Sequence, residues 1–260
     1  MLRPGWARHL RLALVAAATA APLAVMQAPA GAAANPYSQT GYDASYPSAQ
    51  CNASAYPGGF AIIGLGGGRP FTTNTCVAHE WALAPATPVA PSLYFNTGYA
   101  GAYAKKITPA CQAAAVNAPI PPGTPRHQRS VEEQAWAIGC SEAAYAAAHE
   151  PGKPAMWWAD VETSNSWSVN TTYNDLAIDG IAYEMSGLST TTGAGFGFYS
   201  TPAIWSQIAG PGFDSTPTAT ADWQPAPACP AGGFSNSPVW LTQSGTVTAN
   251  GVSFSADQAC

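Results

Sequence analysis

Short apolar runs alternate with helix-like segments along most of this 260-residue chain, and this alternation restricts the possible folds more than any other feature. Eight runs are predicted strands: Gln39–Asp43, Phe60–Leu65, Ser92–Asn96, Ala155–Val161, Gly195–Tyr199, Thr218–Trp223, Val239–Gln243 and Ser253–Ala256. Strands that alternate with helices predict a parallel sheet with helices outside it, and eight strands in this length fit a small closed (β/α) barrel, TIM-like in plan. Because no helical pattern separates the last runs, we expect an incomplete barrel. An open doubly wound sheet is the alternative.

Three segments have helical patterns. The strongest is Ser130–His149, where Ser130 is a good N-cap and Glu133, three residues later, completes a capping box. A second helix is expected over Thr172–Gly187, with the glycine ending it, and a short third over Pro202–Ile208. All three precede the last three predicted strands, which leaves the C-terminal third poor in helix.

The first 34 residues have the pattern of a cleaved signal peptide. Three arginines precede an apolar run from Leu12 to Val25, and a small-residue stretch ends at Ala34. The run is shorter than the roughly 20 residues that a bilayer span requires. We therefore predict a secreted or cell-wall-associated protein, cleaved near Ala34. One globular domain is expected over residues 35–260, with Asn35–Tyr37 as a loose lead-in.

The charge balance excludes one class of partner. Without the three arginines of the signal segment, six Lys and Arg residues face 14 Asp and Glu residues, a formal net charge of −8. Nucleic-acid binding relies on clustered Lys and Arg, so we predict no nucleic-acid partner. No later stretch is apolar for long enough to span a membrane, and we expect a monomer without membrane contact after signal cleavage.

All six cysteines lie in the predicted mature region, and an even count in an exported chain indicates disulfides. Six cysteines allow about 15 pairings. We favour pairing of nearest neighbours because each bridge would then brace a local loop: Cys51 with Cys76, Cys111 with Cys140, and Cys229 with Cys260. Zinc binding is the competing interpretation, but no Cys-x-x-Cys occurs. We expect no metal and no other cofactor.

The segment from Trp157 to Thr163 contains the strongest catalytic candidates, Asp160 and Glu162. Side chains at i and i+2 on a strand share a face, and the C-terminal end of a barrel strand opens onto the site-forming face. Like charges held close together raise one pKa, which keeps a carboxylic acid protonated for general acid catalysis. The alternative is two solvated carboxylates in a loop. Asp43 ends the first predicted strand, so the three carboxylates are expected to converge.

Further polar and aromatic residues near strand ends are candidates for substrate binding. Aromatic rings stack on sugar rings, although core packing is an equally good explanation for Trp158. Amide side chains at strand ends are expected to hydrogen-bond hydroxyl or acetamido groups. The candidates are Asp257, Asp222, Tyr94, Trp158, Tyr199, Trp223, Trp240, Asn96 and Gln243.

Other catalytic signatures are absent from the sequence. The glycine-rich segment Gly64–Gly68 leads into Arg69-Pro70 rather than a helix and lacks the Lys-Ser/Thr of a phosphate-binding loop. His79-Glu80 has no second histidine four residues on, which excludes the zinc-protease signature. No Gly-x-Ser-x-Gly occurs, so the serine-hydrolase elbow is missing as well.

At the acidic positions the sequence resembles the lysozyme-type family 25 glycoside hydrolases and exported glycoside-hydrolase-like proteins related to them. Gly41–Tyr46 is similar to the family's first-strand Asp motif, and Asp160-Val-Glu162 to its Asp-x-Glu. Phe198–Thr201 with Trp205 is similar to the fifth strand and the Trp after it. Residues 240–257 resemble the last two strands. The order and spacing agree over most of residues 39–258.

The resemblance implies a (β/α)5β3 barrel and hydrolysis of the β-1,4 bond between N-acetylmuramic acid and N-acetylglucosamine. In this case Glu162 would be the general acid. Asp160 would orient or stabilise the acetamido group of the substrate, or assist a water. Asp43 and Asp257 would complete an acidic floor.

The chain departs from the family pattern on its penultimate strand. The expected Trp-Gln-Tyr is here Trp240-Leu-Thr, with Gln243 shifted along, and Asp222 lies where no Asp is expected. With the net charge of −8, this departure keeps a second function open, a non-catalytic wall-binding protein on a degenerate barrel. In both cases the expected partner is a cell-wall polysaccharide or a related amino-sugar polymer.

Overall fold

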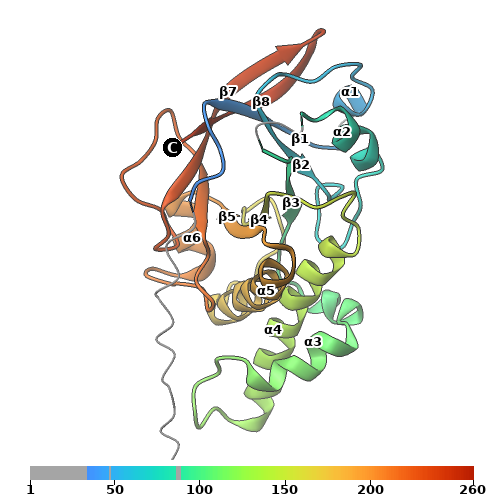
Figure 1. Ribbon diagram of the computed structural model, residues 1–260. Helices are drawn as coiled ribbons and strands as arrows, with labels where there is room; N and C mark the ends of the chain where they lie inside the picture. Colours follow the sequence, from blue (N-terminus) through green and yellow to red (C-terminus); the bar gives the residue numbers. More distant parts are fainter. Residues whose placement is uncertain (1–33, 47, 86–88) are drawn as a thin grey trace, which may run out of the picture. The chain divides into compact units, whose positions relative to one another are not determined.

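The computed structural model describes residues 34–46, 48–85 and 89–260 (Figure 1). Apart from Ala34, the predicted signal peptide lies outside the described residues. Within the described part of the chain, no helix has both the length and the apolar character that crossing a bilayer requires.

The described strands close into a barrel in chain order. Their bounds are β1 Thr40–Ala44, β2 Phe60–Gly64, β3 Ser92–Asn96, β4 Met156–Asp160, β5 Gly195–Tyr199, β6 Ala221–Pro225, β7 Val239–Ala249 and β8 Val252–Ala259. Strands β1 to β7 run parallel, whereas β8 is antiparallel to both β7 and β1. This topology confirms the predicted α/β barrel and rules out an open doubly wound sheet.

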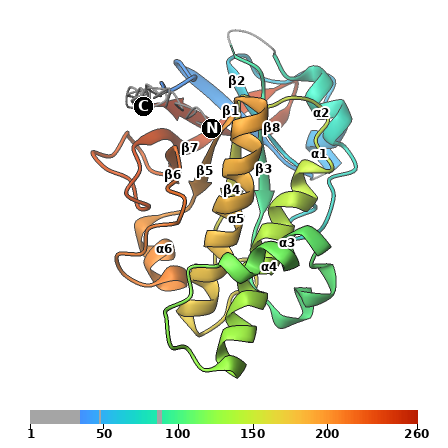
Figure 2. The ribbon, with the colours of Figure 1, turned by 60° about the horizontal axis from the view of Figure 1, so that its bottom comes forward.

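Helices follow the first five strands, and the fully described segment after β6 contains none, as expected. Their bounds are α1 Ser48–Cys51, α2 Val77–Leu83, η1 Gly101–Lys106, α3 Pro109–Ala114, η2 Ala115–Asn117, α4 Arg126–Ala147, α5 Thr171–Thr192 and α6 Pro202–Ala209. The two long helices α4 and α5 pack side by side (Figure 2). A Cβ at Gly139 or Gly180 would overlap the backbone of the other helix, so these glycines permit the close contact.

Strand side chains alternate between the barrel interior and the layer under the helices, as the two-residue period of a strand requires. Trp158, Ile62 and Trp223 belong to the interior cluster, whereas Trp157 and Phe198 pack outside the barrel. Interior glycines make room for the large rings. A Cβ at Gly64 would overlap the Tyr94 ring, and one at Gly197 would overlap Trp158.

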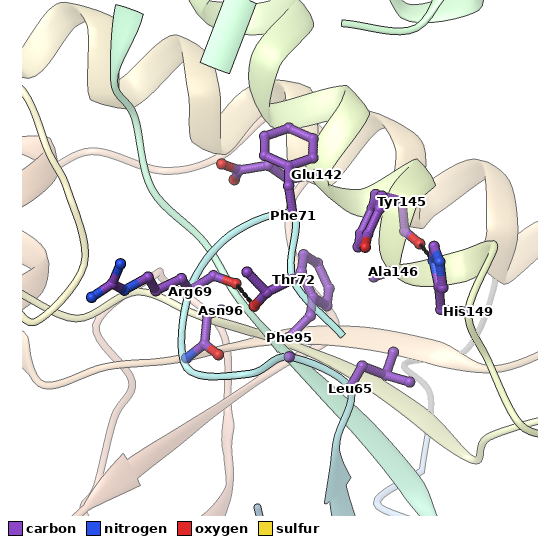
Figure 3. A pocket seen from close by; sticks show the side chains of 11 residues that line it. Leu65, Arg69, Phe71, Thr72, Phe95, Asn96, Glu142, Tyr145, Ala146 and His149 are labelled. Carbon is purple, nitrogen blue, oxygen red and sulfur yellow. Dashed lines mark hydrogen bonds between the residues drawn. The ribbon is translucent and has the colours of Figure 1, made fainter. Parts of the chain in front are cut away.

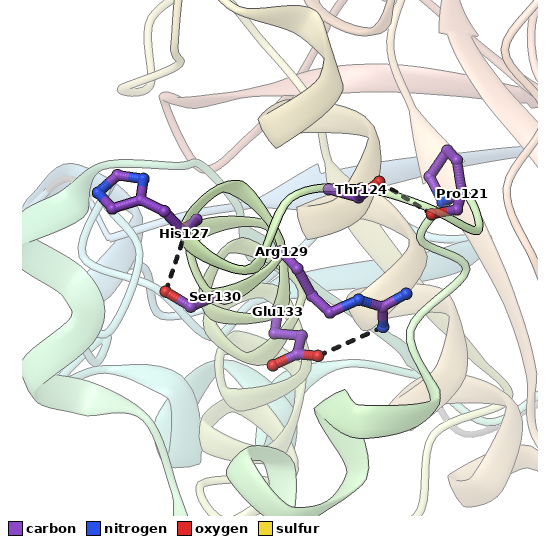
Figure 4. Close-up of polar contacts among 6 residues, drawn as sticks. All are labelled: Pro121, Thr124, His127, Arg129, Ser130 and Glu133. Carbon is purple, nitrogen blue, oxygen red and sulfur yellow. Dashed lines mark hydrogen bonds and ion pairs between the residues drawn. The ribbon is translucent and has the colours of Figure 1, made fainter.

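The predicted start of the longest helix at Ser130 is wrong. Helix α4 begins at Arg126, directly after Pro125, and the Arg129 N–H already donates to the Pro125 carbonyl. Ser130 donates from Oγ to the His127 carbonyl inside the helix, and Glu133 forms an ion pair with Arg129 at 3.5 Å (Figure 4). The proline stops N-terminal extension of the helix, so the Ser-x-x-Glu pattern lies one turn inside it.

The predicted stop of the next long helix at Gly187 is also wrong. Helix α5 continues to Thr192 and ends at Gly193, which has a φ of 76°. A left-handed residue after the last helical turn is the usual place for glycine, because glycine has no Cβ to clash there. Gly187 lies on an open helix face, where a Cβ would meet no other atom within 4 Å.

The N-terminal lead-in is ordered rather than loose. Tyr37 is buried against Phe60, with ring centroids 4.7 Å apart. Its hydroxyl accepts from Trp158 Nε1 at 2.9 Å and contacts Ser92 Oγ at 2.5 Å. Asn35 Nδ2 donates to the Trp240 carbonyl. Segment 35–37 therefore closes the end of the barrel at which the parallel strands begin.

The nearest-neighbour pairing of the cysteines is confirmed. Disulfides join Cys51 to Cys76, Cys111 to Cys140, and Cys229 to Cys260. The first links α1 to the N-cap residue of α2 and the second links α3 to α4, while the third ties the C-terminus to the loop after β6. Three disulfides are typical of proteins from an oxidising compartment.

Candidate active site

A polar pocket of about 160 Å³ opens at the C-terminal ends of the parallel strands. This central pocket is lined by Asp43, Tyr94, Asn96, Asp160, Glu162, Tyr199, Trp223 and Gln243. All eight are among the residues that the sequence nominates. Glu162 lies in the loop directly after β4, and the other seven come from β1, β3, β4, β5, β6 and β7. The mouth of the barrel therefore brings together side chains that are up to 200 residues apart in the chain.

The alternation of side chains along β4 explains why Asp160 and Glu162 both reach the pocket. Asp160 is the last residue of β4 and Glu162 follows two positions later, so both side chains point inward while Val161 packs outside. The two carboxyl groups lie close enough for each to influence the pKa of the other. Glu162 is half-buried, whereas Asp160 is only 5% exposed.

The surroundings of Asp160 favour its protonated form. Oδ2 accepts a hydrogen bond from Asn96 Nδ2 at 2.6 Å, and Oδ1 has no hydrogen-bond partner among the described residues. Burial, and then the charge of Glu162, raise the pKa of Asp160 well above its ordinary value. Burial also raises the pKa of Glu162. The pair therefore retains one proton at a pH where an isolated carboxyl group would have lost it.

A second group of hydrogen bonds positions Asp43 on the opposite wall. Gln243 donates from Nε2 to Asp43 Oδ2 at 2.6 Å, and Tyr199 donates from its hydroxyl to Gln243 Oε1 at 2.8 Å. Burial raises the pKa of Asp43 to about 6, against the lowering effect of the Gln243 and Ser255 hydrogen bonds. The shifted Gln243 is thus a wall residue of the pocket and bonds directly to a candidate catalytic carboxylate.

A β-bulge in β7 explains how the shifted Gln243 reaches this position. Asp222 pairs with Val239 but Trp223 pairs with Leu241, so β7 contains one extra residue, Trp240. Trp240 and Leu241 both pack in the interior cluster. Because the extra residue resets the alternation, Gln243 faces inward, where regular alternation from Trp240 would have placed it outside.

Asp257 and Trp158 lie beneath the central pocket and do not line it. Asp257 is 1% exposed and accepts a hydrogen bond from Trp223 Nε1 at 2.9 Å, which holds the indole that lines the pocket. Burial, and then the charge of Asp43, raise its pKa well above the ordinary range. Trp158 is fully buried in the interior cluster, in keeping with the core-packing interpretation.

The structure does not bring Asp222 to the pocket. Its neighbours Ala221 and Trp223 belong to the interior cluster, so strand alternation turns Asp222 outward. There its carboxylate accepts from the Ser235 backbone N–H at 2.9 Å and from Ser235 Oγ at 2.6 Å. Asp222 therefore anchors the loop before β7. Adjacent residues of a regular strand face opposite sides, and the sequence places Asp222 directly before Trp223, so this signal was available there.

Sequence reasoning missed a further buried carboxylate near the site, Glu142 on α4. Oε2 accepts from the Gly98 N–H at 3.2 Å, and Oε1 has no partner among the described residues. Glu142 lines a small void, about 10 Å³, that shares Asn96 with the central pocket (Figure 3). This volume holds about one water molecule. An acidic residue on the apolar face of a helix was the available signal.

One group of described side chains has the spacing of a metal site: Cys111, Cys140 and Glu184. The two cysteines form a disulfide, so neither offers the thiolate that would bind a metal.

No protein-family model and no curated protein matches the sequence. Three solved structures are similar in fold. A lysozyme from Streptomyces coelicolor has 13% identity and a TM-score of 0.51, over 85% of this chain and 92% of its own. A family 25 glycosyl hydrolase from Bacillus anthracis has 12% identity and a TM-score of 0.49, over 87% of this chain and 91% of its own. A muramidase from Acremonium alcalophilum has 13% identity and a TM-score of 0.48, over 85% and 93%. The first of these supports a shared barrel fold across most of both chains.

Proposed function

We propose that this protein is an exported glycoside hydrolase that cleaves β-1,4 linkages in peptidoglycan or a related amino-sugar polymer. The observation that carries the proposal is the convergence of Asp43, Asp160 and Glu162 on one open polar pocket at the mouth of the barrel, where burial raises the pKa of the carboxyl groups. A protonated and a charged carboxyl group side by side are the groups that glycoside hydrolysis needs. The lysozyme-like fold and the open central pocket also support it.

In the proposed mechanism Glu162 is the general acid because it is the more exposed member of the pair. In the empty pocket the proton favours the more buried Asp160, so it moves from Asp160 to Glu162, and from Glu162 to the leaving glycosidic oxygen as the bond from that oxygen to the anomeric carbon breaks. The ionised carboxylates of the pocket stabilise the positive charge that develops on the sugar ring. Water then adds to the anomeric carbon and returns a proton to the carboxyl groups. Asp160, held by Asn96, orients the acetamido group or the water.

The aromatic residues of the central pocket are proposed to position the sugar. The Tyr199 and Trp223 rings lie 4.4 Å apart between centroids, and Tyr94 contacts Trp223 edge to face at 6.3 Å. Such a cluster offers rigid faces for the C–H groups of a pyranose ring. Asn96 and Gln243 supply hydrogen bonds to polar groups on the sugar.

The proposed function includes export of the protein and a polysaccharide as its partner. The three disulfides require an oxidising compartment, which suits a protein released toward a wall polymer. The expected partner is the polysaccharide itself. We propose that the mature chain acts as a monomer without membrane attachment.

The test is the release of reducing ends from purified peptidoglycan by the wild-type protein and by Glu162→Gln. The amide keeps the size of the side chain but carries no transferable proton, so we expect hydrolysis to fall by at least about 100-fold. Glu150→Gln is the control, since Glu150 is exposed beyond the end of α4. An unchanged rate for Glu162→Gln contradicts the proposed role. Wall binding with no sugar release at any pH favours the non-catalytic alternative.

A further inference from the structure

A second polar hollow, about 270 Å³ in volume, lies beside the central pocket at the same mouth of the barrel. We call it the side pocket. It is lined by residues 68–70 of the loop after β2, residues 164–166 of the loop after β4, and Tyr103 of η1. Since β2, β3 and β4 are parallel neighbours, the loops that follow them all lie at this end.

The side pocket and the central pocket share walls. The Asn165 N–H donates to the Glu162 carbonyl at 3.1 Å, so a single turn carries the candidate acid on one side and the side-pocket wall on the other. The loop after β2 connects the two pockets in the same way. A Cβ added at Gly66 in this loop would lie 2.7 Å from Asn96 Oδ1, in the central pocket, and 3.6 Å from the carbonyl of Arg69, in the side pocket. The loops that line the two pockets are therefore direct neighbours.

Arg69 gives the side pocket a charge opposite to that of the acidic centre. It is exposed and takes part in no ion pair among the described residues, where Arg129–Glu133 is the only one found. Its backbone carbonyl accepts from Thr72 Oγ1 at 2.6 Å, which holds the loop. The guanidinium extends away from Glu142 and His149 (Figure 3). All five of its N–H groups are thus available to a ligand.

The rest of the lining is suited to a sugar derivative. Ser164 and Ser166 are exposed and line the hollow from one loop. Asn165 Nδ2 has no hydrogen-bond partner among the described residues, and a buried amide donor ordinarily has one. The Tyr103 ring is held edge to face by Phe71, with centroids 5.5 Å apart. The side pocket therefore combines one unpaired cation, several neutral donors and one aromatic face.

We propose that the side pocket binds a carboxylate carried by the sugar polymer next to the unit held at Glu162, with Arg69 as its charged partner. This inference rests on the proposed function and adds a specificity determinant to it. The planar fork of arginine matches a carboxylate with two parallel hydrogen bonds. An acidic chain bound across the carboxyl groups of the central pocket needs such a counter-charge, because the predicted mature protein has a net charge of −8.

Two sources of the carboxylate are chemically equivalent here, the lactyl ether of the amino sugar and a peptide attached to it. Calorimetric binding to the inactive Glu162→Gln protein distinguishes them without hydrolysis. The probes are soluble glycan strands stripped of peptide, the same strands with their carboxylates converted to methyl amides, and strands that keep their peptides. Each probe is titrated into the parent and into proteins that also carry Arg69→Gln, Arg69→Lys or Lys153→Gln.

Arg69→Gln is expected to weaken binding of carboxylate-bearing strands about tenfold, the loss of a hydrogen bond to a charged group. Arg69→Lys should recover part of that loss, since it restores the charge without the fork. Lys153→Gln removes one exposed positive charge from the loop before β4, at the opposite end of the barrel, and should bind every probe like the parent. Methyl-amide strands should bind the parent and Arg69→Gln alike.

A loss seen with stripped strands identifies the lactyl carboxylate, and a loss seen only with peptide-bearing strands identifies the peptide. Equal effects of Arg69→Gln on charged and methyl-amide strands overturn the inference, as does an equal effect of Lys153→Gln. The proposed function is judged separately, from release of reducing ends by the wild-type protein. Arg69-dependent binding without any hydrolysis would support the carboxylate site and contradict the proposed enzymatic function.

Discussion

Gln243 donates a hydrogen bond to Asp43 at 2.6 Å and so connects the last parallel strand of the barrel to the first, across 200 residues of sequence. The same amide accepts from the Tyr199 hydroxyl, which fixes its orientation. The bulge at Trp240 makes this contact possible. The bulge therefore turns the Gln243 amide toward the acidic pocket.

Gln243→Met is predicted to raise the pKa of Asp43 above its value of about 6. The Gln243 hydrogen bond stabilises the carboxylate, so its removal favours the protonated form. The pH at which Asp43 ionises, followed by carboxyl carbon NMR, should therefore move upward, and the acidic limb of any pH–rate profile should move with it. Gln112→Met, on the exposed face of α3, is the control. An unmoved titration of Asp43 would contradict the role given to Gln243.

The buried Asp222 predicts that stability falls as the pH rises. Burial raises its pKa from 3.8 to about 6, so the folded state holds a proton that the unfolded chain has already released. Its contribution to the free energy of unfolding is complete below about pH 4 and is lost by about pH 7. The shift of about two pH units corresponds to at most about 3 kcal/mol.

Asp222→Asn should flatten this part of the pH dependence, whatever its effect on absolute stability. Guanidinium unfolding at several pH values between 4 and 7 provides the measurement. Asp214→Asn, at an exposed position, should keep the wild-type slope. Identical slopes for wild type and Asp222→Asn would show that Asp222 ionises in the folded protein as it does in the unfolded chain.

Two glycine substitutions should have opposite effects on stability. Gly197→Ala places a methyl group against the Trp158 ring and the Ala221 carbonyl inside the barrel, and should cost about 3 kcal/mol or more. Gly187→Ala adds a methyl group to an open face of α5 and should stabilise by about 0.5–1 kcal/mol. Guanidinium midpoints test both. A Gly197→Ala protein of wild-type stability would disprove the tight interior packing.

Tyr37→Phe should destabilise the barrel by about 1–3 kcal/mol, because it leaves Trp158 Nε1 without its acceptor in the interior. The substitution keeps the ring that packs on Phe60, so the loss isolates the hydroxyl. Tyr183→Phe, at a side chain 48% exposed on α5, should change stability by less than about 0.5 kcal/mol. If both variants unfold alike, segment 35–37 does not close the barrel.

Local sequence patterns were enough to predict several strands and the main acidic residues of the site. Strand runs ending in acidic residues located β1 and β4, and the two-residue period placed Asp160 and Glu162 on one face. The helix-poor C-terminal third correctly indicated an incomplete barrel. These features depend on neighbours within a few positions, and such local patterns are visible in the sequence.

Errors arose where another contact outweighed the local pattern. Ser130 and Glu133 form a plausible capping box, yet Pro125 starts the helix one turn earlier. Gly187 is a plausible helix stop, yet α5 continues to Gly193. Tyr37 follows a proline near the predicted cleavage site, and only the closed barrel supplies the Trp158 and Ser92 partners that bury it.

The order of residues along the chain is enough to specify the alternation of strands and helices, the paired cysteines, and the acidic and aromatic residues available for a site. The folded barrel was needed to establish that Gln243 faces inward and Asp222 outward, and that Asp160 and Glu162 meet Asp43 in one pocket. Strand register, bulges and burial all depend on contacts between segments up to 200 residues apart, and no local pattern contains those contacts. A buried carboxyl group acquires its raised pKa only when such contacts remove it from water.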